Sequence, residues 1–189
     1  TGTALVPFQV GLTQGFVRDR VYAEDLAVLP GDPDSVAIVR REVDSSGDDG
    51  VGIYTNGVMR SVKASSVYGP RSLAFSGSPS RLYGYDNYTS AYAFSRLDIG
   101  PDGVTLVDST ERLLTGYYAN IHFDGGRIYS ASGQVIDPER LELIGTFPLS
   151  DLIWSRAVVP DLASGVVYAA GSPSYDLVVR KYDPNLFTL

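Results

Sequence analysis

The chain has 189 residues, of which 44% are hydrophobic and 20% charged, values that indicate a folded domain and exclude a disordered chain. Fifteen basic and 22 acidic residues give a net charge of −7 without a basic cluster, so no nucleic acid is expected as a partner. Cysteine is absent, which excludes disulfides, thiolate catalysis and cysteine-ligated metals. No apolar run approaches the ~18 residues of a membrane helix, so no membrane insertion is expected.

Strand signals dominate the chain. Short runs rich in Val, Ile, Tyr, Leu and Phe are separated by turn sequences such as Pro30-Gly31-Asp32-Pro33 and Gly100-Pro101-Asp102-Gly103. Asn56-Gly57 predicts a type I′ hairpin, because both residues accept positive φ angles. The best helix candidate, Asp137–Gly145, is short and opens with Asp-Pro. The sequence therefore predicts an all-β fold.

An internal repeat predicts the architecture. A strand, a polar turn and a second strand with an apolar or aromatic centre occur four times, and the second strands are centred on Ala37, Tyr83, Tyr129 and Tyr168. Successive centres lie 46, 46 and 39 residues apart, and Asp137-Pro138 and Asp183-Pro184 are also separated by 46. A period of ~40–50 residues with about four strands is typical of a propeller blade, whose apolar faces are buried only by stacked neighbours.

We therefore predict a single β-propeller domain over residues 1–189, with about four blades of four antiparallel strands. The repeats are expected at roughly 22–66, 67–115, 116–152 and 153–189. A β-sandwich with evenly spaced strands is the alternative. Four repeats could close a small ring or belong to a larger one of about seven or eight blades. Ala4–Gly11 reads like the last strand of a preceding blade, which favours the larger ring.

Three segments carry a family resemblance: Tyr22–Pro33, Val51–Val58 and Gly126–Gly133. Each resembles the propeller repeats of secreted bacterial multidomain proteins, the YVTN-like or lactonase-like repeat class. The resemblance implies a propeller fold and an extracellular or cell-surface location. Its motifs are structural, so it brings no catalytic residues to this chain.

Two groups of residues are candidate binding sites. Tyr85, Tyr88 and Tyr92 alternate irregularly near a predicted loop and could form a stacking platform for sugar rings or a protein, but core packing is favoured. Asp44, Asp48 and Asp49 lie in an acidic loop that could bind calcium, but their spacing does not match the standard calcium loop and a solvated hairpin is favoured.

No group of residues predicts a catalytic site. His122 is the only histidine, and no Gly-x-Ser-x-Gly segment is present to supply a nucleophile, so we expect His122 to be structural. The leading hypothesis is a non-enzymatic protein-interaction or structural module that binds another protein or a copy of itself, and no cofactor is expected. The alternatives are a glycan-binding propeller and a lactonase-like, metal-dependent hydrolase with carboxylates at a central channel.

Overall fold

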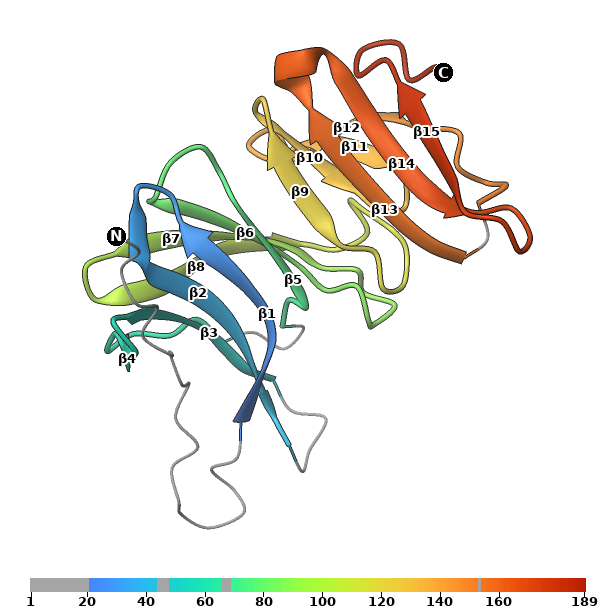
Figure 1. Ribbon diagram of the computed structural model, residues 1–189. Coiled ribbons are helices and arrows are strands. Elements are labelled where there is room, and N and C mark those ends of the chain that lie inside the picture. Colours follow the sequence, from blue (N-terminus) through green and yellow to red (C-terminus); the bar gives the residue numbers. More distant parts are fainter. Residues whose placement is uncertain (1–20, 44–47, 66–68, 153) are drawn as a thin grey trace, which may run out of the picture.

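The computed structural model describes residues 21–43, 48–65, 69–152 and 154–189, with the side chains of 154–156 left aside. The described residues form four sheets, and the strands of each sheet follow one another in chain order and pair antiparallel (Figure 1). The predicted strand at Ala4–Gly11 lies outside these residues.

Each sheet is a meander that begins at its innermost strand. The first contains β1 (Val21–Leu29), β2 (Asp32–Glu42), β3 (Asp48–Thr55) and β4 (Val58–Met59). The second contains β5 (Ser72–Phe75), β6 (Arg81–Tyr85), β7 (Phe94–Gly100) and β8 (Gly103–Thr110). The third contains β9 (Ile121–Asp124), β10 (Arg127–Ser130), β11 (Gln134–Asp137) and β12 (Glu142–Thr146). The fourth contains β13 (Trp154–Asp161), β14 (Val166–Ser172) and β15 (Val178–Tyr182), with the 3₁₀ helix η2 (Leu162–Ser164) between β13 and β14.

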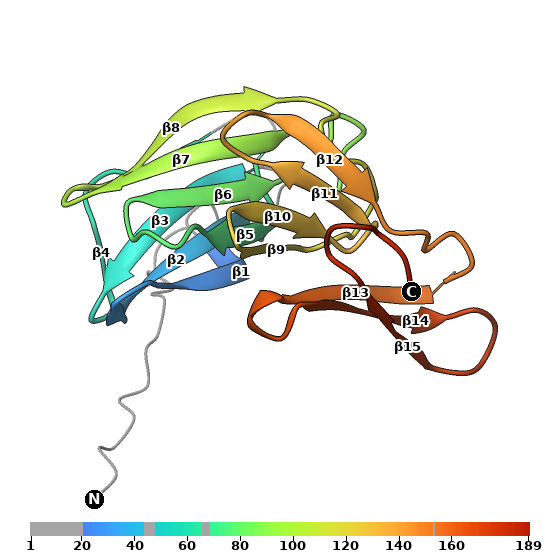
Figure 2. The same ribbon diagram turned by 90° about the horizontal axis from the view of Figure 1, so that it is seen from above.

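The four sheets are the blades of a β-propeller, and the predicted all-β fold is confirmed. The innermost strands pack against one another in sequence order, β1 on β5, β5 on β9 and β9 on β13. Figure 2 shows the blades succeeding one another from the blue first sheet to the red fourth. The fourth blade has three strands among the described residues, instead of the expected four. None of the helices in the described ranges has the length and hydropathy of a membrane span.

Two local sequence predictions have different outcomes. The hairpin at Asn56-Gly57 is confirmed, because Asn56 has φ 49° and Gly57 φ 84° between β3 and β4. The short helix candidate at Asp137–Gly145 forms a turn and most of β12 (Glu142–Thr146). Asp137 Oδ1 instead accepts hydrogen bonds from the backbone N–H groups of Glu139 and Arg140, at 3.0 and 2.9 Å, which closes a turn before β12.

Apolar side chains fill the three spaces between successive blades. One cluster of buried residues joins blades 1 and 2 and includes Val51 and Leu82. A second, with Tyr83 and Ile128, joins blades 2 and 3, and a third, with Tyr129 and Val158, joins blades 3 and 4. Stacking of blades therefore forms the core, as the repeat predicts.

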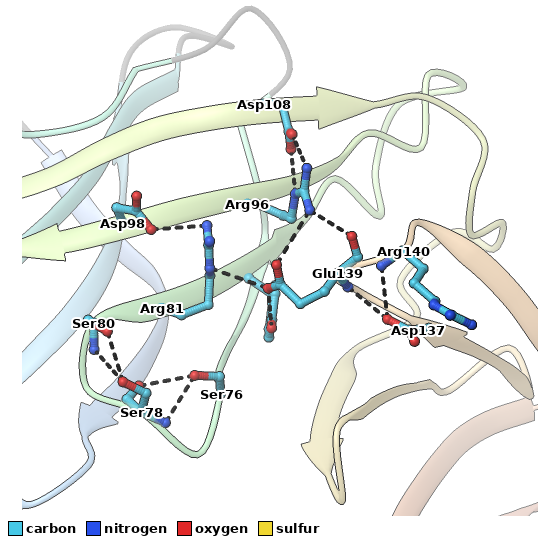
Figure 3. A network of polar contacts seen from close by, with 11 residues as sticks. Ser76, Ser78, Ser80, Arg81, Arg96, Asp98, Asp108, Asp137, Glu139 and Arg140 are labelled. Atoms are coloured by element: carbon cyan, nitrogen blue, oxygen red, sulfur yellow. Dashed lines mark hydrogen bonds and ion pairs between the residues drawn. The ribbon is translucent and has the colours of Figure 1, made fainter.

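A polar network fastens blade 2 to blade 3 beside this core (Figure 3). Its centre is Glu139, in the turn between β11 and β12. Glu139 Oε1 accepts a hydrogen bond from the Tyr83 hydroxyl at 2.8 Å and lies 3.3 Å from Arg81 Nε. Arg96 donates to the backbone carbonyl of Glu139 at 2.9 Å and also binds Asp108. Burial raises the pKa of Tyr83, and the bond to Glu139 acts in the same direction.

Candidate functional site

Four tyrosines gather where two loops of blade 2 meet. Tyr88 and Tyr92 come from the loop between β6 and β7, and Tyr117 and Tyr118 come from the segment that leads from β8 to β9. The rings of Tyr88 and Tyr118 make an edge contact with centroids 5.9 Å apart, and those of Tyr92 and Tyr117 make one at 5.1 Å. We call these four residues the tyrosine platform.

Most of the platform is open to solvent. Tyr88, Tyr117 and Tyr118 are 47%, 55% and 74% exposed, whereas Tyr92 is half-buried. The Arg71 guanidinium lies over the Tyr88 ring, 3.8 Å from its centroid, and also pairs with Glu24 at 3.0 Å. A positive charge and a carboxylate therefore border the exposed rings.

Backbone hydrogen bonds join the two loops that carry the platform. The N–H of Tyr118 donates to the carbonyl of Asn87 at 2.7 Å, and the N–H of Arg112 donates to that of Ala91 at 3.1 Å. The Asn87 side chain returns a bond to the Ala119 carbonyl at 3.1 Å. These bonds fix the relative positions of the two loops.

Sequence reasoning identified only part of this cluster. Tyr88 and Tyr92 belong to the platform, but Tyr85 is fully buried in the core between blades 2 and 3, with its hydroxyl 3.4 Å from the Gly116 carbonyl. Burial raises the pKa of Tyr85. Tyr117 and Tyr118 were missed, because adjacent aromatics after Gly116 fit a buried strand as well as an exposed loop.

The acidic residues proposed as calcium ligands engage basic side chains. Asp49 lies between Arg40 and Lys63, at 2.6 and 2.5 Å. Burial opposes ionisation of Asp49, but these two hydrogen bonds outweigh it and lower its pKa. Asp48 is 3.8 Å from Arg41, and burial raises its pKa. Asp44 lies outside the described residues, and no three His, Asp or Glu side chains converge as metal ligands within them.

His122 and Asp25 lie on innermost strands, β9 and β1. Desolvation lowers the pKa of His122, which the Asp25 carboxylate opposes. Asp25 Oδ2 accepts the backbone N–H of Leu73 at 2.7 Å, and burial raises the pKa of Asp25 despite this bond. The bond ties the innermost strands of blades 1 and 2, so Asp25 has a structural role.

Strand pairing places the four blades in a common register. The second-strand residues Ala37, Tyr83, Tyr129 and Tyr168 pair with Ala27, Ala74, His122 and Val159 of the innermost strands. The first three second-strand residues are at most 2% exposed, because each faces the next blade. Tyr168 is 40% exposed, since it faces outward from the last described blade.

The opposite side of the blades shows the same pattern. The equivalent residues on the opposite side of the innermost strands are Leu26, Leu73, Ile121 and Val158. The last three face the preceding blade, and no described blade precedes that of Leu26. The last three are at most 6% exposed, but Leu26 is 58% exposed. Among the described residues, the two ends of the blade stack thus carry exposed apolar side chains: the first-blade face (Leu26, Val28 and Met59) and the fourth-blade face (Val159, Tyr168 and Val179). Ile38 and Tyr54, on the same side of the first blade, are buried.

Solved structures of propellers resemble the chain at low sequence identity. Hydrazine synthase from Kuenenia stuttgartiensis matches with a TM-score of 0.58 and 17% identity, over 88% of this chain and 47% of that one. A gluconolactonase from Xanthomonas campestris matches with a TM-score of 0.54 and 16% identity, over 74% of this chain and 51% of that one. The chain is a β-propeller.

These likenesses show the fold and nothing finer. The chain spans about half the length of the two solved chains that it matches. No protein-family model and no curated protein sequence matches it.

Proposed function

We propose that the chain is a non-enzymatic association module that joins through its end faces to another propeller blade, in the first place that of a second copy. The observation that carries the proposal is the exposure of Leu26 and Tyr168. Their equivalents in the other blades, Leu73 and Tyr129 among them, are buried against a neighbouring blade. Leu26 and Tyr168 thus occupy repeat positions that are buried in the blades whose neighbour on that side is present.

The two faces are opposite halves of one repeated interface. In each contact between successive blades, the side of one blade that faces the next blade (its forward side) packs against the side of that next blade that faces the preceding one (its backward side). The fourth-blade face is a forward side and the first-blade face is a backward side, so they match each other in kind. Burial of apolar side chains on both would supply the driving force, at ~25 cal/mol for each Å² removed from water.

This geometry predicts a head-to-tail contact. Such contacts are heterologous, and they close into a ring or extend as a filament according to the rotation between copies. Two chains of four blades would supply eight, which is within the usual range of four to eight.

We further propose that the chain belongs to the YVTN-like or lactonase-like repeat class of exported bacterial proteins. The segments that resemble this repeat class support the assignment. Tyr22–Pro33 contains most of β1 and its turn into β2, and Gly126–Gly133 contains β10. Exported propellers of that kind present their faces outside the cell. Fractionation of the producing cell tests the location, and recovery of the protein only from the cytoplasm would contradict it.

Sedimentation velocity tests the association. The unaltered chain is expected to form species heavier than its 20.3 kDa monomer as its concentration rises. Leu26→Asp or Tyr168→Asp should shift it to the monomer, because each places a charge on one apolar face. Val107→Asp is the matched control, since Val107 is 46% exposed but lies on β8, away from both end faces. An unaltered chain that stays monomeric at all concentrations would overturn the proposal.

A further inference from the structure

We infer that the tyrosine platform is a binding site for neutral carbohydrate chains. This inference is independent of the end faces, because it rests on loop residues of blade 2. The four rings form two contacting pairs, Tyr88 with Tyr118 and Tyr92 with Tyr117, and three of them are 47% or more exposed. Contiguous exposed apolar patches often mark binding sites.

Backbone conformation gives a second, independent observation. Tyr92 and Tyr118 have φ angles of 47° and 57°, and Arg112 in the same loops has 60°. Bulky side chains rarely adopt this left-handed region, and residues held there concentrate at binding sites. The bonds from Tyr118 N–H to Asn87 and from Arg112 N–H to Ala91 hold the strain in place. Two platform rings are therefore presented in a strained, preorganised arrangement.

The chemistry of the patch favours a sugar over an apolar peptide. The exposed large apolar side chains in the two loops are Tyr88, Tyr117 and Tyr118, each with a hydroxyl, and the exposed set includes no aliphatic residue there. A pyranose ring has an apolar C–H face that stacks on an aromatic ring and hydroxyls that exchange hydrogen bonds at its rim. The Arg71 and Glu24 side chains supply further donors and acceptors beside Tyr88.

The charges beside Tyr88 favour neutral sugars. The chain carries a net charge of −7, which repels acidic polysaccharides. Arg71 is the cation in contact with the Tyr88 ring, and it is already paired with Glu24 at 3.0 Å. An anionic sugar would have to displace that carboxylate, whereas a neutral chain would not.

Titrations followed by NMR with ¹⁵N-tyrosine labelling provide the test. The probes are the β-linked hexasaccharides of glucose, N-acetylglucosamine and mannose, with hexamannuronate and decaproline for comparison. We expect at least one neutral hexasaccharide to shift the signals of Tyr88, Tyr117 and Tyr118. The signal of Tyr175, which is fully exposed but outside the platform, should stay in place.

Substitutions locate the site. Tyr118→Asn removes the ring while keeping a residue that tolerates positive φ, so the loop should keep its fold, and affinity should fall by at least about fivefold. Tyr175→Ala should leave affinity unchanged, and Tyr118→Trp should restore it. The inference is overturned if no neutral hexasaccharide shifts the platform signals, if only hexamannuronate or decaproline does, or if Tyr118→Asn binds as tightly as the parent chain.

Discussion

Asp25 on β1 accepts a hydrogen bond from the backbone N–H of Leu73 on β5, at 2.7 Å. Ser72 on β5 repeats the relation with the N–H of Ile121 on β9, at 3.1 Å. Asp25 and Ser72 occupy the same repeat position, because they pair with Val39 and Tyr85, two residues beyond Ala37 and Tyr83. The innermost strands of blades 1 and 2 thus each bind the backbone of the next blade through a side-chain acceptor.

Loss of this acceptor should destabilise the chain. Asp25→Ala leaves the N–H of Leu73 without its partner, and we expect the free energy of unfolding to fall by about 1–3 kcal/mol. Asp25→Asn retains an oxygen acceptor and should cost less. Urea unfolding of the two variants measures the difference, and an equal cost would show that the hydrogen bond does not matter.

The pKa of Asp25 predicts a pH dependence. Burial raises this pKa in the folded chain, so ionisation of Asp25 opposes folding. The associated stability is present below the unfolded value of ~3.8 and is lost as pH rises through the raised pKa. The stability of Asp25→Asn relative to the parent chain should therefore increase between about pH 3 and neutral pH. Urea titrations across that range test the sign, and a decrease would contradict it.

Equivalent leucines in two blades should respond differently to truncation. Leu73→Ala opens a cavity between blades 1 and 2 and should cost about 2–5 kcal/mol. Leu26→Ala affects an exposed side chain and should cost the dilute monomer less than about 1 kcal/mol. Thermal or urea unfolding at low protein concentration compares them. Similar losses in both variants would mean that Leu26 is covered within the monomer.

The network around Glu139 should add to the contact between blades 2 and 3. Glu139→Ala removes the acceptor of the Tyr83 hydroxyl and should lower the free energy of unfolding by about 1–2 kcal/mol. In a Tyr83→Phe background the same change should cost less, and this double-mutant cycle isolates the pair. Additive losses would place the effect of Glu139 in its contacts with Arg81 and Arg96 instead.

The ion pairs of Asp49 bear on the calcium prediction. Arg40 and Lys63 already neutralise this carboxylate, so we expect calcium at about 1 mM to leave the melting temperature unchanged. Asp49→Asn should lower the melting temperature at neutral pH, because the depressed pKa of Asp49 stabilises the fold above ~3.8. A rise in melting temperature with calcium, reversed by chelation and absent in Asp49→Asn, would contradict this expectation.

Much of the fold could be predicted because the blades repeat in the sequence at a regular spacing. The spacing of Ala37, Tyr83 and Tyr129 corresponds to one residue per blade at the same register, and Asn56-Gly57 forms the turn that its φ preferences require. The turn at Asp137 was harder to read, because Asp-Pro opens both helices and tight turns. The side-chain bonds to Glu139 and Arg140 fit a helix start as well. The positive φ of Leu141, 58°, and the strand that begins at Glu142 show that the segment is a turn.

The candidate site was less predictable because exposure depends on tertiary contacts. Tyr85 and Tyr88 are three residues apart and equally aromatic, yet Tyr85 packs between blades while Tyr88 lies on the surface. Tyr117 and Tyr118 reach Tyr92 and Tyr88 only because the two loops hydrogen-bond to each other. Tyr168 is exposed for a similar reason, since no described blade follows it.

A mixing experiment tests the head-to-tail association most directly. Leu26→Asp keeps the fourth-blade face and Tyr168→Asp keeps the first-blade face, so each variant alone should sediment as a monomer. An equimolar mixture should form a heterodimer, because one intact contact of opposite faces becomes available. A mixture that remains monomeric while the unaltered chain associates would contradict the pairing of the first-blade face with the fourth-blade face.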